Sequence, residues 1–365
     1  MIAKEAARIF HDWATREGLV VGQPALPSTQ DESSKIAPLT EAGRTLLRQK
    51  QVMSICFSEA QELITVFTRL VPPKAKKTLA TLPSSIENVS IRYRQGSHIT
   101  AGDLPVQPFG GPAYIVRTSL NGDNRYTCGS SISVGNNVDA GTLGALVQDA
   151  NGQLYGLSNN HVTGCCNFAE RNLPIVAPGI RDVTATGLSP FTIGRHHIAL
   201  PLQIGSPDTV DVTQNTDAAI FRIENSAIVS SHQGDSFDTP SLVDSMAGGM
   251  TVRKVGRTTG HTSGEVIGQQ YGQFSVNYSA QRYGFMGSIY FENVFTIQGI
   301  GDSFSDHGDS GSLIVSNIQG VDYAVGIVFA GMQDANAPGG KITLALPIEP
   351  ILTHLGVSLV SGHNL

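Results

Sequence analysis

From about residue 86 to the C-terminus, the chain is a succession of short runs rich in Val, Ile, Thr and aromatic residues, each ending at Gly, Asn or Asp. Examples are ENVSIRYRQG, GTLGALVQDANGQLYGLSNNHV, TDAAIFRIEN and YAVGIVFAGM. Such runs between turn residues are typical of β-strands, and helix-period stretches between them are lacking. This pattern disfavours a parallel βαβ fold and favours a sandwich or barrel. The pair Asn151-Gly152 predicts a hairpin turn between two of the runs.

The composition agrees with a β-rich chain. The 365 residues include 40 glycines, and only 15% are charged, as expected for many tight turns between short strands. A formal net charge of −6 gives no broad electrostatic attraction to nucleic acid or to an anionic membrane surface, so neither is expected as a partner. The length allows two or three domains with a sizeable core.

The first residues argue against export. Lys4, Glu5, Arg8 and Asp12 interrupt the segment MIAKEAARIFHDWATREG, which excludes the apolar core of a secretory signal. No stretch approaches 18 consecutive apolar residues. We therefore expect a cytoplasmic protein, and the presence of only four cysteines agrees with a reducing compartment.

Two of these cysteines, Cys165 and Cys166, are adjacent, and a disulfide between neighbours would be strained. With His161 they suggest a metal site, but no second pair of cysteines or histidines at ligand spacing completes four ligands. We expect neither a metal nor another cofactor.

Residues 1–85 are expected to be a helical N-terminal segment with a regulatory or assembly role, through docking on the barrels or self-association. Thr40 is a suitable N-cap for a long second helix that would continue through Leu70 to Pro72-Pro73. A short helix is also expected at 348–355, near the C-terminus. Apolar residues at spacings of three and four give the first helix one apolar face: Ile2, Ala6, Ile9, Phe10 and Trp13.

The segment FSDHGDSGSLIV, residues 304–315, raises the question of function. Gly, Asp and Ser are ordinary turn residues, so a turn before a strand is one interpretation. The other is a nucleophile loop, because serine catalysis needs a hydroxyl and nearby donors for an oxyanion. Ser310 would then be the nucleophile. Gly308 would let its own N–H and that of Ser310 point at one spot.

A serine nucleophile also needs a base, and an acid that orients the base. His161 follows an apolar run in YGLSNNHVTG, where a side chain would project from the end of a strand. Asp217 opens TDAAIFRI, although an acid at the start of a strand is also explained as a turn residue. Each is ordinary alone, but with Ser310 they supply the three groups of a catalytic triad.

These segments resemble the active-site blocks of trypsin-like serine proteases. The blocks are SNNHV, TDAAIFRI and GDSGSLIV, in the chain order of chymotrypsin, with GTLGALV before the histidine, KVGRTTGHTSGEV between, and VGIVFAG after the serine. The nearer resemblance is to bacterial relatives of the plant narrow-leaf trypsin-like protein. It rests on AGTLGALV, NTDAAI, VGRTTG and FSxxGDSGS, and it covers about residues 100–355.

The resemblance implies a mainly β fold: a chymotrypsin-like double β-barrel of six strands each, with an N-terminal helical segment. The lead-in strands and first barrel would occupy residues 86–245, and the second barrel residues 246–365. The site would lie in the cleft between the barrels. An α/β-hydrolase is the weaker alternative, because its G-x-S-x-G motif requires glycine at the position of Ser312.

By the same resemblance, His161 is the general base and acid, Asp217 orients it, Ser310 is the nucleophile, and the Gly308 and Ser310 amides form the oxyanion hole. Asp309 would be structural. In digestive members of the family, the corresponding acid pairs with a new N-terminus made by activation cleavage. No such cleavage sequence stands a barrel's distance before His161, so the chain is expected to need no such activation, or to be controlled by its N-terminal segment.

The implied function is a serine endopeptidase that hydrolyses protein or peptide substrates through an acyl-enzyme. Trypsin has an acid six positions before its serine, where this chain has Phe304, which predicts an apolar or small residue before the scissile bond. Phe329 and Gly331 would line the same pocket, and an alignment shift of one or two positions would place Asp306 there instead. The alternative function is a catalytically silent module of the same fold that binds peptides or partners.

Overall fold

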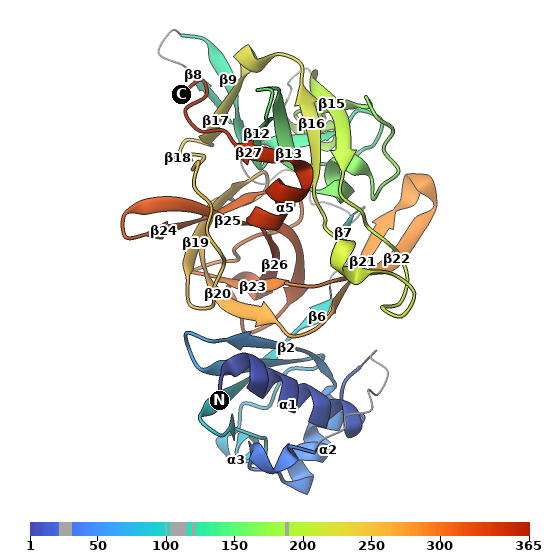
Figure 1. The fold of residues 1–365 in the computed structure, drawn as a ribbon, viewed down its shortest axis with the longest axis vertical. Helices are drawn as coiled ribbons and strands as arrows, with labels where there is room; N and C mark the ends of the chain where they lie inside the picture. Colours follow the sequence, from blue (N-terminus) through green and yellow to red (C-terminus); the bar gives the residue numbers. More distant parts are fainter. Residues whose placement is uncertain (22–30, 99–100, 103–114, 119–121, 187–189) are drawn as a thin grey trace.

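The computed structural model describes residues 1–21, 31–98, 101–102, 115–118, 122–186 and 190–365. Most of its regular structure is β-strand, and the helices are short. Figure 1 shows three parts along the long axis: an N-terminal module at one end, a barrel in the middle, and a second set of curved strands at the other end. The predicted mainly β fold with two barrel units is confirmed.

The first barrel unit is an antiparallel sheet in the order β11-β10-β14-β15-β16-β13-β12-β27. The predicted hairpin joins β12 to β13, with Gly152 at a φ of +78°. This sheet has eight strands instead of the implied six, and its described pairings leave it open. Its members are β10 (Ser131–Val134), β11 (Gly141–Thr142), β12 (Ala145–Asp149), β13 (Leu154–Ser158), β14 (Pro174–Ala177), β15 (Phe191–Ala199), β16 (Ala219–Ile223) and β27 (Val357–Leu359).

A smaller four-stranded sheet lies beside this unit, and Gln233 links the two by donating a hydrogen bond to the Gly144 carbonyl at 2.8 Å. The helix α4 (Ile180–Thr186) lies against β10. The strands of the smaller sheet are β8 (Val116–Thr118), β9 (Asn124–Cys128), β17 (Val229–Gln233) and β18 (Phe237–Asp238).

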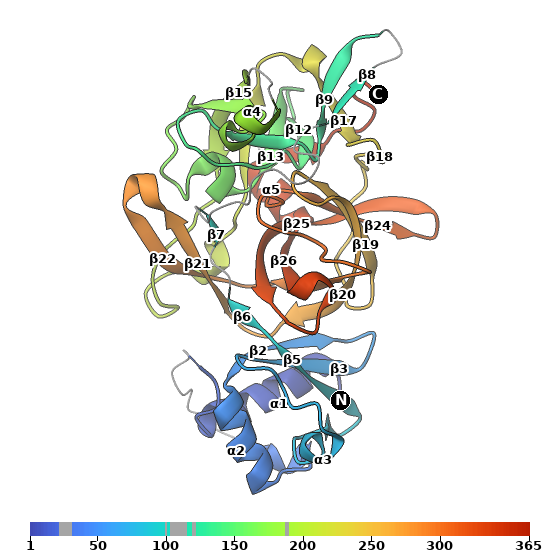
Figure 2. The same ribbon diagram turned by 180° about the vertical axis from the view of Figure 1, so that it is seen from behind.

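The second unit is a closed six-stranded barrel. Its strands pair in the order β20-β19-β24-β25-β26-β23, and β23 pairs back with β20 to close the ring. A separate hairpin, β21 (Phe274–Ala280) and β22 (Phe285–Phe291), projects to one side (Figure 2). The barrel strands are β19 (Thr251–Gly256), β20 (Gly260–Gln270), β23 (Phe295–Gly299), β24 (Leu313–Ile318), β25 (Val321–Gln333) and β26 (Lys341–Pro347).

The N-terminal module combines helices with strands. The predicted first helix is present as α1 (Ala3–Arg16), whose apolar face covers β2 and β3, although Ile2 itself is 63% exposed. Thr40 caps α2 (Glu41–Lys50) as predicted, because its Oγ1 accepts a hydrogen bond from the Gly43 amide at 2.9 Å. The other elements are β1 (Ile36–Ala37), β2 (Val52–Ser58), β3 (Leu63–Thr68), α3 (Lys76–Leu79), β4 (Ser85–Ile86) and β5 (Val89–Gln95).

The long helix predicted through Leu70 is wrong. The helix ends at Lys50, the next residue Gln51 has a φ of +60°, and the chain continues as the hairpin of β2 and β3. All six residues of β3 are buried, and a fully buried apolar strand has no alternation that would distinguish it from a helix by periodicity. Its Ile, Thr and Val side chains are the β-branched residues that favour strands.

This module is joined to the second barrel through backbone and side chains. β2 pairs with β20, which places β1 to β5 and the barrel in one continuous sheet. Arg94 on β5 forms an ion pair with the fully buried Asp334 at 2.8 Å, just after β25. Two short strands, β6 (Ser97–His98) and β7 (Ala101–Gly102), lead the chain from the module toward the first barrel (Figure 2).

The largest apolar cluster lies between the two barrel units and includes Leu157 on β13, Tyr278 on β21 and Leu313 on β24. The C-terminal helix α5 (Ile348–Leu355), predicted with these bounds, packs on the same cluster before β27 returns to the first unit. Within the described ranges, no helix has the length and apolar character that crossing a bilayer requires.

Candidate active site

His161 and Asp217 are brought together by two paired strands. β13 leads into the wide helical turn η2 (Asn160–Gly164), which carries His161, and β16 begins two residues after Asp217. Ser158 at the end of β13 faces Ala219 at the start of β16. His161 Nδ1 therefore lies 2.6 Å from Asp217 Oδ2, and the His161 amide donates to Asp217 Oδ1 at 3.0 Å. With Nδ1–H held by the carboxylate, Nε2 is the nitrogen left to accept a proton.

Asp217 has a further buried partner in Tyr278. The Tyr278 hydroxyl donates to Asp217 Oδ2 at 2.8 Å, and both residues are fully buried. Burial, together with the Asp217 charge, raises the pKa of Tyr278 well above its ordinary value, so the phenol stays protonated and remains a donor. The sequence analysis missed Tyr278, and no local signal marks it, because its contact with Asp217 joins distant strands.

The structure places Ser310 on a loop against the end of β13, the strand that leads to His161. The Thr142 amide donates to the Ser310 carbonyl at 2.9 Å. The following residue must be glycine: Gly311 has a φ of +96°, and a Cβ there would lie 2.5 Å from the Ser158 Oγ. The Ser310 side chain is half-buried at this junction of the two units.

The peptide bonds before Gly308 and Ser310 are both oriented by hydroxyl groups. Thr258 Oγ1 donates to the His307 carbonyl at 2.6 Å, and Ser312 Oγ donates to the Asp309 carbonyl at 2.6 Å. In a trans peptide the C=O and the following N–H point in opposite directions. The Gly308 and Ser310 N–H groups therefore point away from these hydroxyls, and neither donates to any described residue. Both amides are thus available as donors, as the predicted oxyanion hole would need.

Glycine is needed at position 308 on two grounds. Gly308 has a φ of +98°, and a Cβ there would lie 2.5 Å from Thr258 Oγ1. The same hydroxyl that orients the peptide therefore also excludes a side chain.

The fully buried Asp309 is held by the second barrel. Lys254 Nζ lies 3.2 Å from its Oδ2, and the amides of Thr258 and Thr259 donate to its Oδ1 at 2.7 and 3.2 Å. Burial lowers the pKa of Lys254, while the Asp309 charge opposes that shift. Lys254 is a residue that the sequence analysis did not single out, although it lies in the quoted KVGRTTG block. An internal lysine thus neutralises the acid that precedes Ser310, with no need for a free N-terminus.

Behind this loop, a buried ion pair joins the two units. Arg257, which is 2% exposed, donates from Nε to Asp182 Oδ2 at 2.8 Å and from Nη1 to Thr258 Oγ1 at 2.9 Å. The Arg257 amide also donates to Thr142 Oγ1 at 3.1 Å. The Thr258 hydroxyl therefore accepts a hydrogen bond from Arg257 while it donates one to the His307 carbonyl, which fixes its orientation.

The residues predicted for the specificity pocket are separated in the core. Phe304 is 1% exposed in the apolar cluster inside the second barrel, whereas Phe329 belongs to the cluster between the units, with its ring centre 5.1 Å from that of Phe291. Gly331 lies on β25 opposite Thr343 of β26. Asp306, the other candidate, is paired with Lys341. A pocket formed by these residues stays a prediction.

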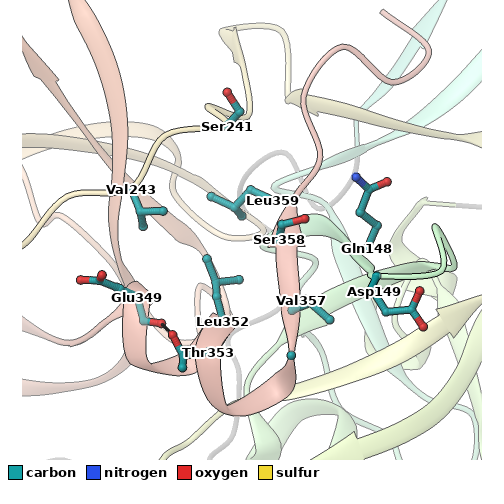
Figure 3. Close-up of a pocket in the computed structure, with 12 residues that line it drawn as sticks. Gln148, Asp149, Ser241, Val243, Glu349, Leu352, Thr353, Val357, Ser358 and Leu359 are labelled. Carbon is teal, nitrogen blue, oxygen red and sulfur yellow. Dashed lines mark hydrogen bonds between the residues drawn. The ribbon is translucent and has the colours of Figure 1, made fainter.

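All four cysteines are buried and form no disulfide. Within the described ranges, no three His, Cys, Asp or Glu side chains lie close enough together to hold a metal ion. A hollow of about 430 Å³ lies elsewhere, between α5, β27 and the β12 end of the first sheet (Figure 3). Asp149 and Glu349 lie on its wall, and no triad residue lines it.

Comparison with known proteins finds similar solved structures. Protease A of Thermobifida fusca matches with 19% identity over 65% of this chain and 98% of its own, at a TM-score of 0.41. The chymotrypsin of Cellulomonas bogoriensis matches with 16% identity over 64% of this chain and 98% of its own, at a TM-score of 0.41. A glutamic acid-specific serine protease matches with 20% identity over 64% of this chain and 100% of its own, at a TM-score of 0.42.

No protein-family model matches the sequence, and no match was found among curated proteins. The solved structures named above are described as a protease, a chymotrypsin and a serine protease, and their sequences are distant from this one. The nearer resemblance to relatives of the plant narrow-leaf protein finds no support in these comparisons.

Proposed function

We propose that the protein is a serine endopeptidase that uses His161, Asp217 and Ser310 as a catalytic triad. The observation that carries this proposal is a His–Asp hydrogen bond of 2.6 Å together with a serine loop whose Gly308 and Ser310 amides donate to no described residue. A turn that only connects two strands needs neither arrangement. Burial of Asp217 and its bond to Tyr278 further suit a group that holds an imidazole in one tautomer.

In this proposal, His161 Nε2 takes the proton of the Ser310 hydroxyl as Oγ adds to the carbonyl carbon of a peptide bond. The Gly308 and Ser310 amides stabilise the resulting oxyanion, and Asp217 stabilises the imidazolium. His161 then gives the proton to the leaving amine. Water hydrolyses the acyl-enzyme by the reverse sequence of proton transfers.

The substrate preference in this proposal is the one predicted from the sequence, an apolar or small residue before the scissile bond. Of the two aromatic residues behind that prediction, Phe329 belongs to the apolar cluster between the units, whereas Phe304 is buried inside the second barrel. Asp306 does not change this expectation, because Lys341 already pairs with it.

A fluorophosphonate probe tests the nucleophile, and a peptide-library digest tests the activity. The wild type should be labelled and should cleave after apolar or small residues, and Ser310→Ala should abolish both signals. Ser303→Ala is the matched control, since it removes another hydroxyl of the same loop and should leave both signals unchanged. A folded wild type with neither label nor cleavage would overturn the proposal in favour of a silent peptide-binding module.

A further inference from the structure

The hollow beside α5 is bordered on one side by an open strand edge. β27 lines the hollow and is the last strand of the first sheet. The Val360 amide donates to the Leu146 carbonyl at 2.9 Å, and because antiparallel bonds alternate along a strand, Ser358 is the next residue bonded to β12. The N–H and C=O groups of Val357 and Leu359 therefore point away from β12, at the free edge of the sheet.

A second backbone edge borders the same hollow at Val243. The Ala324 amide of β25 donates to the Leu242 carbonyl at 2.9 Å, and the Asp244 amide donates to the Ala324 carbonyl at 3.1 Å. In this parallel bridge, the N–H and C=O groups of Val243 itself point away from β25. Neither group is bonded to another backbone group in the part of the chain that the structure describes.

These unpaired backbone groups favour an extended chain as the ligand. An extended peptide binds a free strand edge by adding a strand, because its own N–H and C=O groups alternate in the same way. A helix has most of its backbone groups paired internally and cannot bind an edge like this. The volume of about 430 Å³ leaves room for several side chains of such a peptide.

The side chains around the hollow are apolar at its centre and acidic at its sides. Figure 3 shows Leu352 and Leu359 near the centre, with Glu349 on one side and Asp149 on the other. Among the described residues that line the hollow, these two are the charged ones, and none is basic. A hydrogen bond of 2.9 Å from the Gln153 amide lowers the pKa of Asp149, so this carboxylate stays ionised at neutral pH.

The two carboxylates flank the free edge. Asp149 faces Val357 in the register of β12 and β27, which places it beside the beginning of β27. Glu349 is exposed in the first turn of α5, the helix that leads into β27. A ligand along β27 therefore meets negative charge beside both of these elements, and Lys or Arg side chains complement it.

We propose that this hollow binds an extended peptide segment in which apolar residues are flanked by basic ones. The peptide adds a strand to β27, places an apolar side chain against Leu352, and pairs its basic residues with Asp149 and Glu349. No triad residue lines the hollow, so the inference goes beyond the proposed function and does not depend on it.

The probe is a fluorescein-labelled hexapeptide, Lys-Val-Thr-Val-Thr-Lys, which alternates apolar and polar residues between two lysines. Fluorescence anisotropy measures its binding to the full-length Ser310→Ala protein, a background in which the proposed peptidase cannot cut it. We expect saturable binding that weakens as salt is added. The same peptide with N-methyl groups on alternate residues has lost strand donors and should not bind.

Two variants in this background test the charge of the site. Glu349→Lys reverses a charge on the wall and should weaken binding by at least about fivefold. Asp208→Lys is the matched control, because it makes the same change of charge at an exposed position that does not line the hollow. It should bind like the parent protein.

A second pair of variants tests the apolar wall. Val243 and Leu242 are neighbours with exposed fractions of 37% and 47%, but only Val243 lines the hollow. Val243→Ser should weaken binding by at least about threefold, and Leu242→Ser should leave it unchanged. Neither change removes a backbone group, so both proteins should keep the bridge to β25.

Three results would overturn the inference. The first is no saturable binding up to about 1 mM peptide, which is weaker than a specific site would give. The second is equal binding of the N-methylated peptide, or equal affinities of Glu349→Lys and Asp208→Lys, since the peptide would then bind without the strand edge or elsewhere. The third is a dimer in sedimentation velocity that excess peptide does not dissociate, which would make a second copy of this chain the occupant.

Discussion

Replacing Lys254 by methionine should cost about 3 kcal/mol of unfolding free energy and most of the peptidase activity. The Lys254 ammonium is fully buried 3.2 Å from Asp309 Oδ2, and methionine has a similar length without the charge. Removing one partner of a buried ion pair costs roughly 3–5 kcal/mol, because the other charge is left uncompensated. Asp309 keeps the amides of Thr258, Thr259 and Asp306 as donors, so we expect the lower end of that range.

The activity should fall with the stability, because Asp309 lies between the two amides of the proposed oxyanion hole. Urea unfolding measures the loss of stability, and active-site titration with a fluorophosphonate measures the loss of activity. Lys341→Met is the matched control. Lys341 on β26 pairs with Asp306 of the same loop, and both side chains are about one-third exposed, so loss of this ion pair should cost less than about 1 kcal/mol.

Two results would refute this reasoning. One is a Lys254→Met protein whose unfolding free energy lies within about 0.5 kcal/mol of the wild type, which is the size of an ordinary surface effect. The other is an equal loss for both lysine variants. The double variant Lys254→Met with Asp309→Asn should recover part of the stability, because it removes the stranded charge.

Three further predictions follow from the same contacts. Thr258→Val, which frees the His307 carbonyl, should lower kcat by roughly 10- to 100-fold with little change in KM, whereas Thr258→Ser should restore the rate. Thr262→Val, which removes a similar bond to the Phe304 carbonyl, should leave kcat unchanged in the same steady-state assay. Tyr278→Phe should lose roughly 1.5–3 kcal/mol in urea unfolding, since the Asp217 carboxylate loses a buried donor. Burial, together with the nearby charge of His197, lowers the pKa of His196 to about 4. As the pH falls, the unfolded chain therefore protonates this imidazole before the folded chain does. Stability from this group should be complete above pH 6.5 and fall by roughly 2–3 kcal/mol toward pH 4, and urea unfolding of His196→Asn should lack that loss.

The blocks that carry the proposed site were predictable because their residue types are specific over a few positions. GDSGS requires glycine at 308 and 311, and the structure shows why: both have positive φ and no room for a Cβ. The His161–Asp217 contact was predictable from the resemblance of SNNHV and TDAAIFRI to protease blocks in one chain order, since the position of each residue beside a strand-like run also fits an ordinary turn. The C-terminal helix was recognisable from its short apolar repeat and its end at Gly356.

The remaining features depend on contacts between distant segments. Tyr278 and Lys254 reach Asp217 and Asp309 across the fold, and nothing in their neighbouring sequence marks them. The error in the N-terminal segment has a local cause: Leu63–Thr68 is buried throughout and shows no polar alternation, so its sequence pattern fits a helix and a buried strand equally.

The VGRTTG block links the first unit to the loop of the proposed oxyanion hole. Thr142 of the first unit accepts a bond from the Arg257 amide and donates from Oγ1 to the Gly308 carbonyl at 2.8 Å. Arg257 of the second unit binds Asp182 of the first, and the same guanidinium donates to Thr258 Oγ1, which orients the peptide before Gly308. The segment around Gly308 is thus held by groups from both units, whereas the peptide before Ser310 is oriented by Ser312 of its own loop. The loop that carries the proposed nucleophile therefore depends on contacts between the two units, and the proposed chemistry would take place at their junction.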